Sequence, residues 1–175
     1  PDTGELRGMV NEQTKLICIN NPNNPTGALM DRALLEEIVR IARDADAWLL
    51  CDEVYRGLAH EGDAFGVSVA DLYEKGISTG SMSKTFSLAG LRLGWIAAPR
   101  AFLEQILRHR DYNTISCGMI DEYLAAIALE HKDKIVARSR AIVTSNLAIL
   151  ERWLQTQPKL SFIKPRAGTT AFLKM

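Results

Sequence analysis

The chain alternates short apolar runs with amphipathic helical segments, and this alternation limits it to few folds. Strands are predicted at residues 15–19, 47–51, 77–81 and 94–98, and the first two are continuous apolar runs. Continuous hydrophobicity is typical of strands in a parallel sheet whose two faces are covered by helices. We therefore predict an α/β fold with a mostly parallel sheet and helices on both faces.

Apolar residues at helical spacing occur between and after these strands. Residues 31–45 carry apolar side chains on one face and charged side chains on the other, and residues 68–73 form a shorter predicted helix. Beyond Pro99 the chain is predicted to be helical at residues 101–110, 120–130 and 132–156. The last of these helices has an apolar stripe, formed by Ile135, Ile142, Val143, Leu147, Leu150 and Leu154.

The composition excludes several classes of function. The 175 residues include 21 basic and 21 acidic side chains, so the formal net charge is zero. No overall basic field can attract nucleic acid or an anionic membrane surface. No apolar stretch approaches the ~20 residues needed to span a bilayer. We expect neither nucleic acid nor a membrane as a partner, and small anions must be bound by a few well-placed groups.

The cysteine pattern indicates a reducing compartment. Cys18, Cys51 and Cys117 have no metal-ligand spacing, so no metal site is predicted. Cys18 and Cys51 lie inside apolar runs and are predicted to be buried free thiols. Because an odd number of cysteines without a secretory signal favours the cytosol, we expect a cytoplasmic protein.

Polar segments follow three of the predicted strands. Residues 20–27, 52–55 and 81–84 each begin at or close to a predicted strand end. In parallel sheets, ligands bind beyond the carboxyl ends of the strands. The three segments are therefore predicted to meet at one ligand site.

Four motifs coincide with these positions or follow them. They are Asn-Asn-Pro-Thr-Gly at 23–27, Cys-Asp-Glu-Val-Tyr at 51–55, Ser-Met-Ser-Lys at 81–84 and Gly-Leu-Arg-Leu-Gly-Trp at 90–95. In order and spacing they resemble the fold-type I pyridoxal-phosphate enzymes, in particular the class I/II aminotransferase family. The resemblance implies pyridoxal 5′-phosphate as the cofactor. It also implies that residues 1–156 are a partial cofactor-binding large domain with a long connecting helix, and that residues 157–175 start a truncated small domain.

The resemblance assigns roles to four residues around the cofactor ring. Lys84 would bind the cofactor through its amine and then move a proton between the substrate Cα and the cofactor C4′ as general base and acid. Asp52 would pair with the protonated pyridine nitrogen, and Tyr55 and Asn24 would hydrogen-bond the 3′-oxygen. Simpler interpretations remain for each residue type: a surface lysine, a capping or turn aspartate, and an asparagine that only forms a turn.

Three further residues would bind the cofactor phosphate. Ser81, Ser83 and Arg92 are the candidates, and Arg92 follows Lys84 by eight residues, as in the family. A planar guanidinium can bind phosphate oxygens with a two-pronged fork, whereas Ser83 can also be explained as a small residue in a tight turn. Residues 113–116 resemble the segment that reaches the neighbouring subunit's phosphate in family dimers, so the resemblance implies a homodimer.

The function implied is that of an aminotransferase, which moves an amino group between an amino acid and a 2-oxo acid. A C–S lyase, a decarboxylase or a cyclising synthase of the same fold remains an alternative, because these motifs bind the cofactor and do not choose the reaction. A non-catalytic fragment or regulatory domain is a further alternative. Family enzymes carry an N-terminal phosphate-binding loop and a C-terminal carboxylate-binding arginine that have no counterpart here. We expect a piece of a longer protein, whose exposed sheet edges favour association of the isolated chain.

Overall fold

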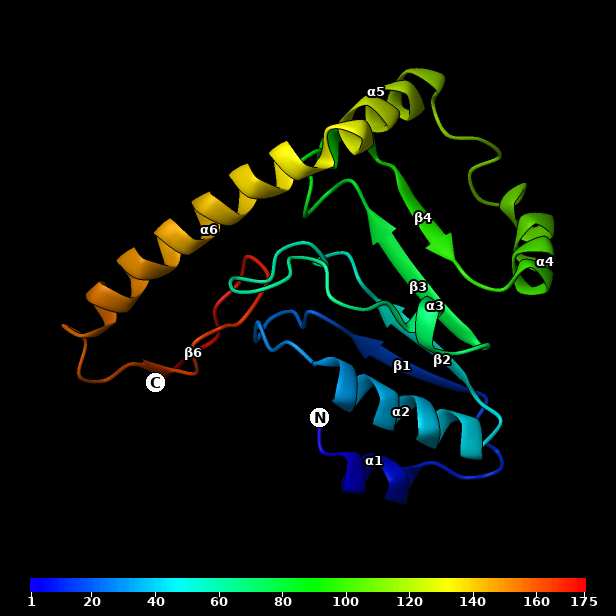
Figure 1. The fold of residues 1–175 in the computed structure, drawn as a ribbon, viewed down its shortest axis with the longest axis horizontal. Helices are drawn as coiled ribbons and strands as arrows, with labels where there is room; N and C mark the ends of the chain where they lie inside the picture. Colours follow the sequence, from blue (N-terminus) through cyan, green and yellow to red (C-terminus); the bar gives the residue numbers. More distant parts are fainter.

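The computed structural model describes all 175 residues and is built around a four-stranded sheet. Its strands, in spatial order, are β1 (Leu16–Asn20), β2 (Trp48–Asp52), β3 (Gly76–Ser81) and β4 (Gly94–Ala97) (Figure 1). The first three strands run parallel, and β4 runs antiparallel to β3. The predicted α/β fold with a mostly parallel sheet is therefore confirmed.

The direction of β4 follows from the connection that precedes it. A parallel strand pair needs a crossover connection, which is usually a helix packed on the sheet. The segment between β3 and β4 contains only the short 3₁₀ helix η1 (Ala89–Leu91). The chain therefore turns back beside β3, an outcome that the apolar pattern of residues 94–98 alone did not predict.

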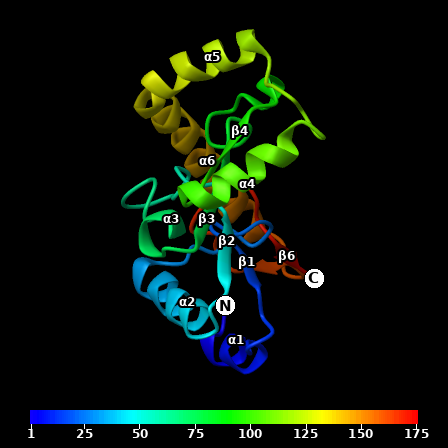
Figure 2. The same ribbon diagram turned by 90° about the vertical axis from the view of Figure 1, so that its right-hand side faces the viewer.

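One face of the sheet is covered by the N-terminal helices. These are α2 (Arg32–Asp44) and α3 (Val69–Leu72), which Figure 2 shows on the same side of the strands, and α1 (Thr3–Met9) packs against α2. α2 is capped at its N-terminus by Asp31, whose side chain accepts a hydrogen bond from the Leu34 amide. Its predicted apolar face packs against Ile17, Leu49 and Cys51 and forms the main core.

The opposite face is exposed along β1, which corrects the prediction for Cys18. Side chains alternate between the two faces of a strand, so Cys18 projects away from the face that buries Ile17. Cys18 is exposed. Cys51 is buried on the α2 side of the sheet, and this burial raises the pKa of the Cys51 thiol. On the exposed face, the ring of Trp48 lies 4.7 Å from the ring of Phe102, which belongs to α4 (Arg100–Arg110).

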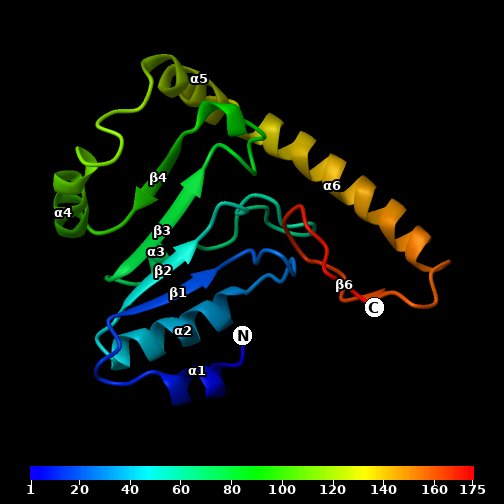
Figure 3. The same ribbon diagram turned by 180° about the vertical axis from the view of Figure 1, so that it is seen from behind.

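The C-terminal part of the chain is mainly helical and extends away from the sheet. Its elements are α5 (Met119–Glu130), α6 (Lys132–Leu154), β5 (Ser161–Phe162) and β6 (Leu173–Lys174), and the last two pair as a separate sheet. Of the stripe predicted on α6, Leu147 is buried but Ile142 is 44% exposed. After α6 the chain returns to the loops at the carboxyl ends of the strands (Figure 3). No helix of the chain has the length and apolar character required to cross a membrane.

Candidate active site

The carboxyl ends of β1, β2 and β3 bring three polar side chains side by side. The strand register places Asn20 beside Asp52, and Asp52 beside Thr79. Because side chains alternate along a strand, all three project from the face opposite α2. Asn20 and Asp52 belong to two of the predicted polar segments, whereas Thr79 lies within β3, before the third.

Asp52 is fixed by its neighbours through one oxygen only. Its Oδ1 accepts a hydrogen bond from the Val54 amide at 3.1 Å and lies 3.5 Å from the Thr79 hydroxyl. Its Oδ2 has no hydrogen-bond partner in the protein, and the residue is half-buried. A carboxylate oriented in this way can accept a hydrogen bond from a cationic N–H of a ligand.

A chain of hydrogen bonds connects Asp52 to Tyr55. The Asn20 side-chain Nδ2 donates to the Asp52 backbone carbonyl at 2.9 Å, and the Asn24 backbone N–H donates to Asn20 Oδ1 at 2.7 Å. The Asn24 side chain then donates to the Tyr55 hydroxyl at 3.3 Å. Asn24 and Tyr55, both predicted from the sequence, are therefore in direct contact. Asn20 was not predicted as a site residue, although its position as the last residue of a strand was a usable signal.

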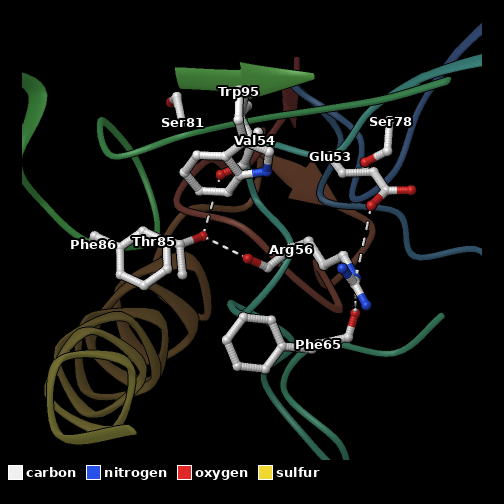
Figure 4. A pocket seen from close by; sticks show the side chains of 10 residues that line it. Glu53, Val54, Arg56, Phe65, Ser78, Ser81, Thr85, Phe86 and Trp95 are labelled. Atoms are coloured by element: carbon white, nitrogen blue, oxygen red, sulfur yellow. Dashed lines mark hydrogen bonds and ion pairs between the residues drawn. The ribbon is translucent and has the colours of Figure 1, made fainter. Parts of the chain in front are cut away.

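Lys84 lies next to the same tyrosine and has no partner of its own. Its Nζ is 5.8 Å from the centroid of the Tyr55 ring, and it forms no ion pair or hydrogen bond. The following residue, Thr85, is buried, and its hydroxyl lies 3.2 Å from the Val54 carbonyl and 2.8 Å from the Arg56 carbonyl (Figure 4). The turn that carries Lys84 is thereby attached to the loop that carries Tyr55.

The residues predicted to bind phosphate are only partly brought together. Ser81, the last residue of β3, and Ser83, in the turn before Lys84, are both half-buried, and Ser81 Oγ accepts a hydrogen bond from the Ser83 amide at 3.2 Å. Arg92 ends η1 with a positive φ of 49°, and its guanidinium donates to the Ala89 carbonyl at 2.9 Å. No hydrogen bond joins Arg92 to either serine.

The carboxylate of Glu53, next to Asp52 in the sequence, is buried. Glu53 Oε1 accepts hydrogen bonds from the Ser68 hydroxyl and the Val69 amide, both at 3.0 Å. Its Oε2 lies 3.7 Å from Arg56 Nε and has no hydrogen-bond partner. Figure 4 shows this carboxylate and Trp95 at the edge of a small cavity beside the Thr85 hydroxyl. Glu53, the residue after Asp52, is therefore connected to the start of α3 by two hydrogen bonds.

The segment from Pro165 to Gly168 forms a further side of the site, which sequence reasoning assigned only to the start of a small domain. A Cβ on Gly168 would lie 3.6 Å from Tyr55 Cδ1. Gly27, the last residue of the Asn-Pro-Thr-Gly motif, has a φ of +68°, and a Cβ there would lie only 2.3 Å from Pro165 Cβ. Glycine is therefore required at position 27 both by the backbone conformation and by the close approach of the returning chain.

The donor set fits the cofactor that the motifs imply. Pyridoxal phosphate needs an amine for its aldehyde, an acceptor for its ring nitrogen and donors for its ring oxygen. Lys84 has a free amine, Asp52 has a free carboxylate oxygen, and Tyr55 and Asn24 lie together beside them.

Comparison with known proteins gives the same family over almost the whole chain. The family model described as "Aminotransferase class I and II" matches residues 2–175. A capreomycidine synthase from Streptomyces vinaceus is 31% identical over 98% of this chain and 44% of that protein. An aromatic-amino-acid aminotransferase from Thermococcus litoralis is 39% identical over 71% of this chain and 33% of that protein.

Solved structures share the fold as well. A PLP-dependent aminotransferase from Streptococcus suis 89-1591 superposes with a TM-score of 0.94 at 45% identity, covering 100% of this chain and 46% of that chain. The aspartate aminotransferase of Thermus thermophilus with maleate gives a TM-score of 0.88 at 27% identity, covering 97% of this chain and 44% of that chain. The chain thus spans less than half the length of these relatives. By its sequence and its fold, it belongs to the class I and II aminotransferase family.

Proposed function

We propose that the full-length protein containing this chain is a pyridoxal-phosphate-dependent aminotransferase that moves an amino group between an amino acid and a 2-oxo acid. The observation that carries this proposal is the free amine of Lys84 beside Tyr55, which is connected through Asn24 and Asn20 to Asp52. Relatives named as aspartate and aromatic-amino-acid aminotransferases support the reaction class.

The roles follow from the position of each group. Bound pyridoxal phosphate supplies an electron sink for negative charge at the substrate Cα. Lys84 would hold the cofactor aldehyde carbon and carry the proton to and from Cα. Asp52 would keep the ring nitrogen protonated, and Tyr55 with Asn24 would bind the ring oxygen.

The phosphate is assigned to the turn before Lys84. Ser81 and Ser83 would bind it through their hydroxyls, and Arg92 would bind it once its guanidinium leaves the Ala89 carbonyl. The charge of the phosphate favours that exchange, because a charged acceptor binds a guanidinium more strongly than a carbonyl does.

The reaction is tested with the full-length protein, pyridoxal phosphate and a panel of amino acids. We expect 2-oxo acid products that form only when a second oxo acid is added as amino acceptor. Lys84→Ala should abolish this turnover, whereas Lys159→Ala, a lysine outside the site, should retain it. Turnover of Lys84→Ala at the wild-type rate would contradict the proposal.

A synthase of the same fold is the second candidate. It is favoured by the relative named capreomycidine synthase, which matches 98% of this chain. The same amino acid panel separates the two reactions, because a synthase acts without an added oxo acid. Release of ammonia and pyruvate without an oxo acid would instead indicate a lyase, and release of carbon dioxide a decarboxylase.

We also propose that the full-length protein is a homodimer. Apolar side chains are exposed around the start of α5, and such patches commonly mark protein interfaces: Tyr112 (87%), Ile115 (72%), Met119 (82%), Ile120 (71%) and Tyr123 (68%). Light scattering of the full-length protein should give twice the monomer mass. A monomer at micromolar concentration would contradict the proposal.

The division of the chain and its compartment remain part of this proposal. Residues 1–156 would belong to the cofactor-binding domain and residues 157–175 to the start of a second domain, which is supported by the separate pairing of β5 with β6. A cytoplasmic location is supported by the three cysteines, all of which are free.

A further inference from the structure

The side chain of His60 lies between two carbonyl groups of a distant segment. Its Nδ1 is 3.0 Å from the Pro165 carbonyl oxygen, and its Nε2 is 2.9 Å from the Gly168 carbonyl oxygen. The backbone N–H of His60 also donates to the Arg166 carbonyl at 2.9 Å. One residue therefore makes three polar contacts with a segment more than 100 positions further along the chain.

The chemistry of these contacts depends on the charge of the ring. A carbonyl oxygen can only accept a hydrogen bond, and a neutral imidazole has a single N–H. At these distances a neutral ring makes one hydrogen bond and holds its other nitrogen against a second acceptor. The imidazolium form has two N–H groups and satisfies both carbonyls.

No carboxylate competes for this ring. The salt bridges of the chain do not include His60. The charged side chains around the contact face solvent or have other partners: Glu61 is exposed, Arg166 donates to the Leu29 carbonyl, Lys164 pairs with Glu151 and Arg140 donates to the Gly62 carbonyl. The Pro165 and Gly168 carbonyls are therefore the groups whose hydrogen bonds to the ring depend on its charge.

The segment that His60 contacts also packs on the site. The Arg166 and Ala167 amides donate to the Gly27 carbonyl at 2.8 and 3.1 Å, and the Gly168 amide donates to the Leu58 carbonyl at 3.0 Å. Gly168 lies against the Tyr55 ring. The segment is thus held between the loop that carries Tyr55 and the turn that carries Asn24.

We propose that His60, in its charged form, is a positioning residue that holds residues 165–168 against Tyr55 and the Asn-Pro-Thr-Gly turn. Loss of the ring proton removes one of its two hydrogen bonds and loosens the segment. Because only the doubly protonated ring satisfies both carbonyls, the segment should be held more firmly at acidic pH than at alkaline pH. The effect on catalysis rests on the proposed function, whereas the contact itself does not.

The contact is tested first by NMR and hydrogen exchange on the full-length protein without substrate. We expect the ¹⁵N shifts of the His60 ring to show both nitrogens protonated at pH 5. The protection factors of the Ala167 and Gly168 amides should fall about ten-fold between pH 5 and pH 8, because a hydrogen bond to a charged group is lost. In His60→Gln, which has no charge to lose, these factors should match the pH 8 wild-type values throughout.

His131→Gln is the matched control, since His131 is exposed and its side chain forms no hydrogen bond. It should retain the wild-type pH dependence at both amides. A ring with one protonated nitrogen at pH 5, or protection that is independent of pH in the wild type, would overturn the proposal.

The consequence for catalysis is measured separately as kcat/KM against pH. The wild type should lose activity toward pH 8 relative to His60→Gln, whose profile should lack this step. Failure of the aminotransferase assignment would remove this activity but would leave the ring shifts and amide protection unchanged, so the two failures are distinguishable.

Discussion

Three neighbours fix the position of Asp52. The Thr79 hydroxyl on β3 and the Val54 amide in the following loop contact its carboxylate, and the Asn20 side chain on β1 donates to its backbone carbonyl. One of its carboxylate oxygens is occupied by protein donors and the other is free. The place of Asp52 at a strand end predicted that it lies at a ligand site, and the family resemblance implied its partner group. The sequence placed Asn20 in the polar segment 20–27 but gave it no role of its own, because its contact with the Asp52 carbonyl depends on the pairing register of β1 and β2.

Replacing Asp52 by alanine separates catalysis from stability. We expect kcat to fall by about 100-fold or more, because the charge opposite the ring nitrogen is removed. The free energy of unfolding should fall by about 2 kcal/mol, since the charge-assisted hydrogen bond that the carboxylate accepts from the Val54 amide is lost. Steady-state kinetics and urea unfolding measure the two effects. Asp111→Ala, at an exposed helix end, is the control, and a kcat within two-fold of wild type for Asp52→Ala would refute the role.

At the adjacent position, replacing Glu53 should reduce stability more than replacing Asp52 does. Its buried carboxylate accepts hydrogen bonds from Ser68 and Val69, so Glu53→Ala leaves two buried donors without partners. We expect a loss of about 3 kcal/mol in the free energy of unfolding, measured by urea denaturation. Glu12→Ala, in an exposed loop, should change stability by less than about 0.5 kcal/mol. Equal effects of the two substitutions would contradict the role of Glu53.

At the scale of the elements, the strands and longer helices were predictable because their apolar spacing is regular. β1, β2 and β3 each lie within one residue of the predicted start or end. α1 was missed because none of its residues is buried, so it has no apolar stripe to read. The burial of Cys18 was wrongly predicted because a continuous apolar run does not reveal which face of an edge strand is covered.

The close approach of Pro165 to Gly27 joins the C-terminal segment to the Asn-Pro-Thr-Gly turn, and its contribution to stability can be tested by substitution. Gly27→Ala should destabilise the protein by about 2 kcal/mol or more, since alanine is strained at this positive φ and its Cβ would clash with Pro165. Gly8→Ala in α1, where a Cβ meets open space, should instead be neutral or slightly stabilising. Thermal unfolding distinguishes them, and an unchanged Tm for Gly27→Ala would contradict the packing described here.

An ion pair between Arg43 of α2 and Glu74 in the loop after α3 predicts a pH dependence. Hydrogen bonding to the Arg43 guanidinium lowers the pKa of Glu74 to about 2. Because the pKa is lower in the folded state, the stabilisation is complete above the unfolded value near pH 4.5 and is lost as the pH falls toward 2. NMR titration of the Glu74 carboxyl measures this directly. A folded-state pKa at or above 4.5 would contradict the pairing.

At the scale of the whole molecule, the family and the cofactor chemistry were predictable because four local motifs carry them. The antiparallel β4 and the return of residues 165–168 to the site were not, since both depend on how distant segments pack. Figure 3 shows that this return brings the C-terminal chain beside the loops that carry Asn24 and Tyr55. The site is therefore formed by residues that span nearly the whole sequence.

Lys84 is proposed to bind the aldehyde of pyridoxal phosphate. The direct test is to incubate the full-length protein with pyridoxal phosphate, reduce it with borohydride, digest it and map the labelled peptide by mass spectrometry. We expect a single stable adduct on Lys84 that is absent from Lys84→Ala. Labelling of other lysines with Lys84 unmodified would contradict it.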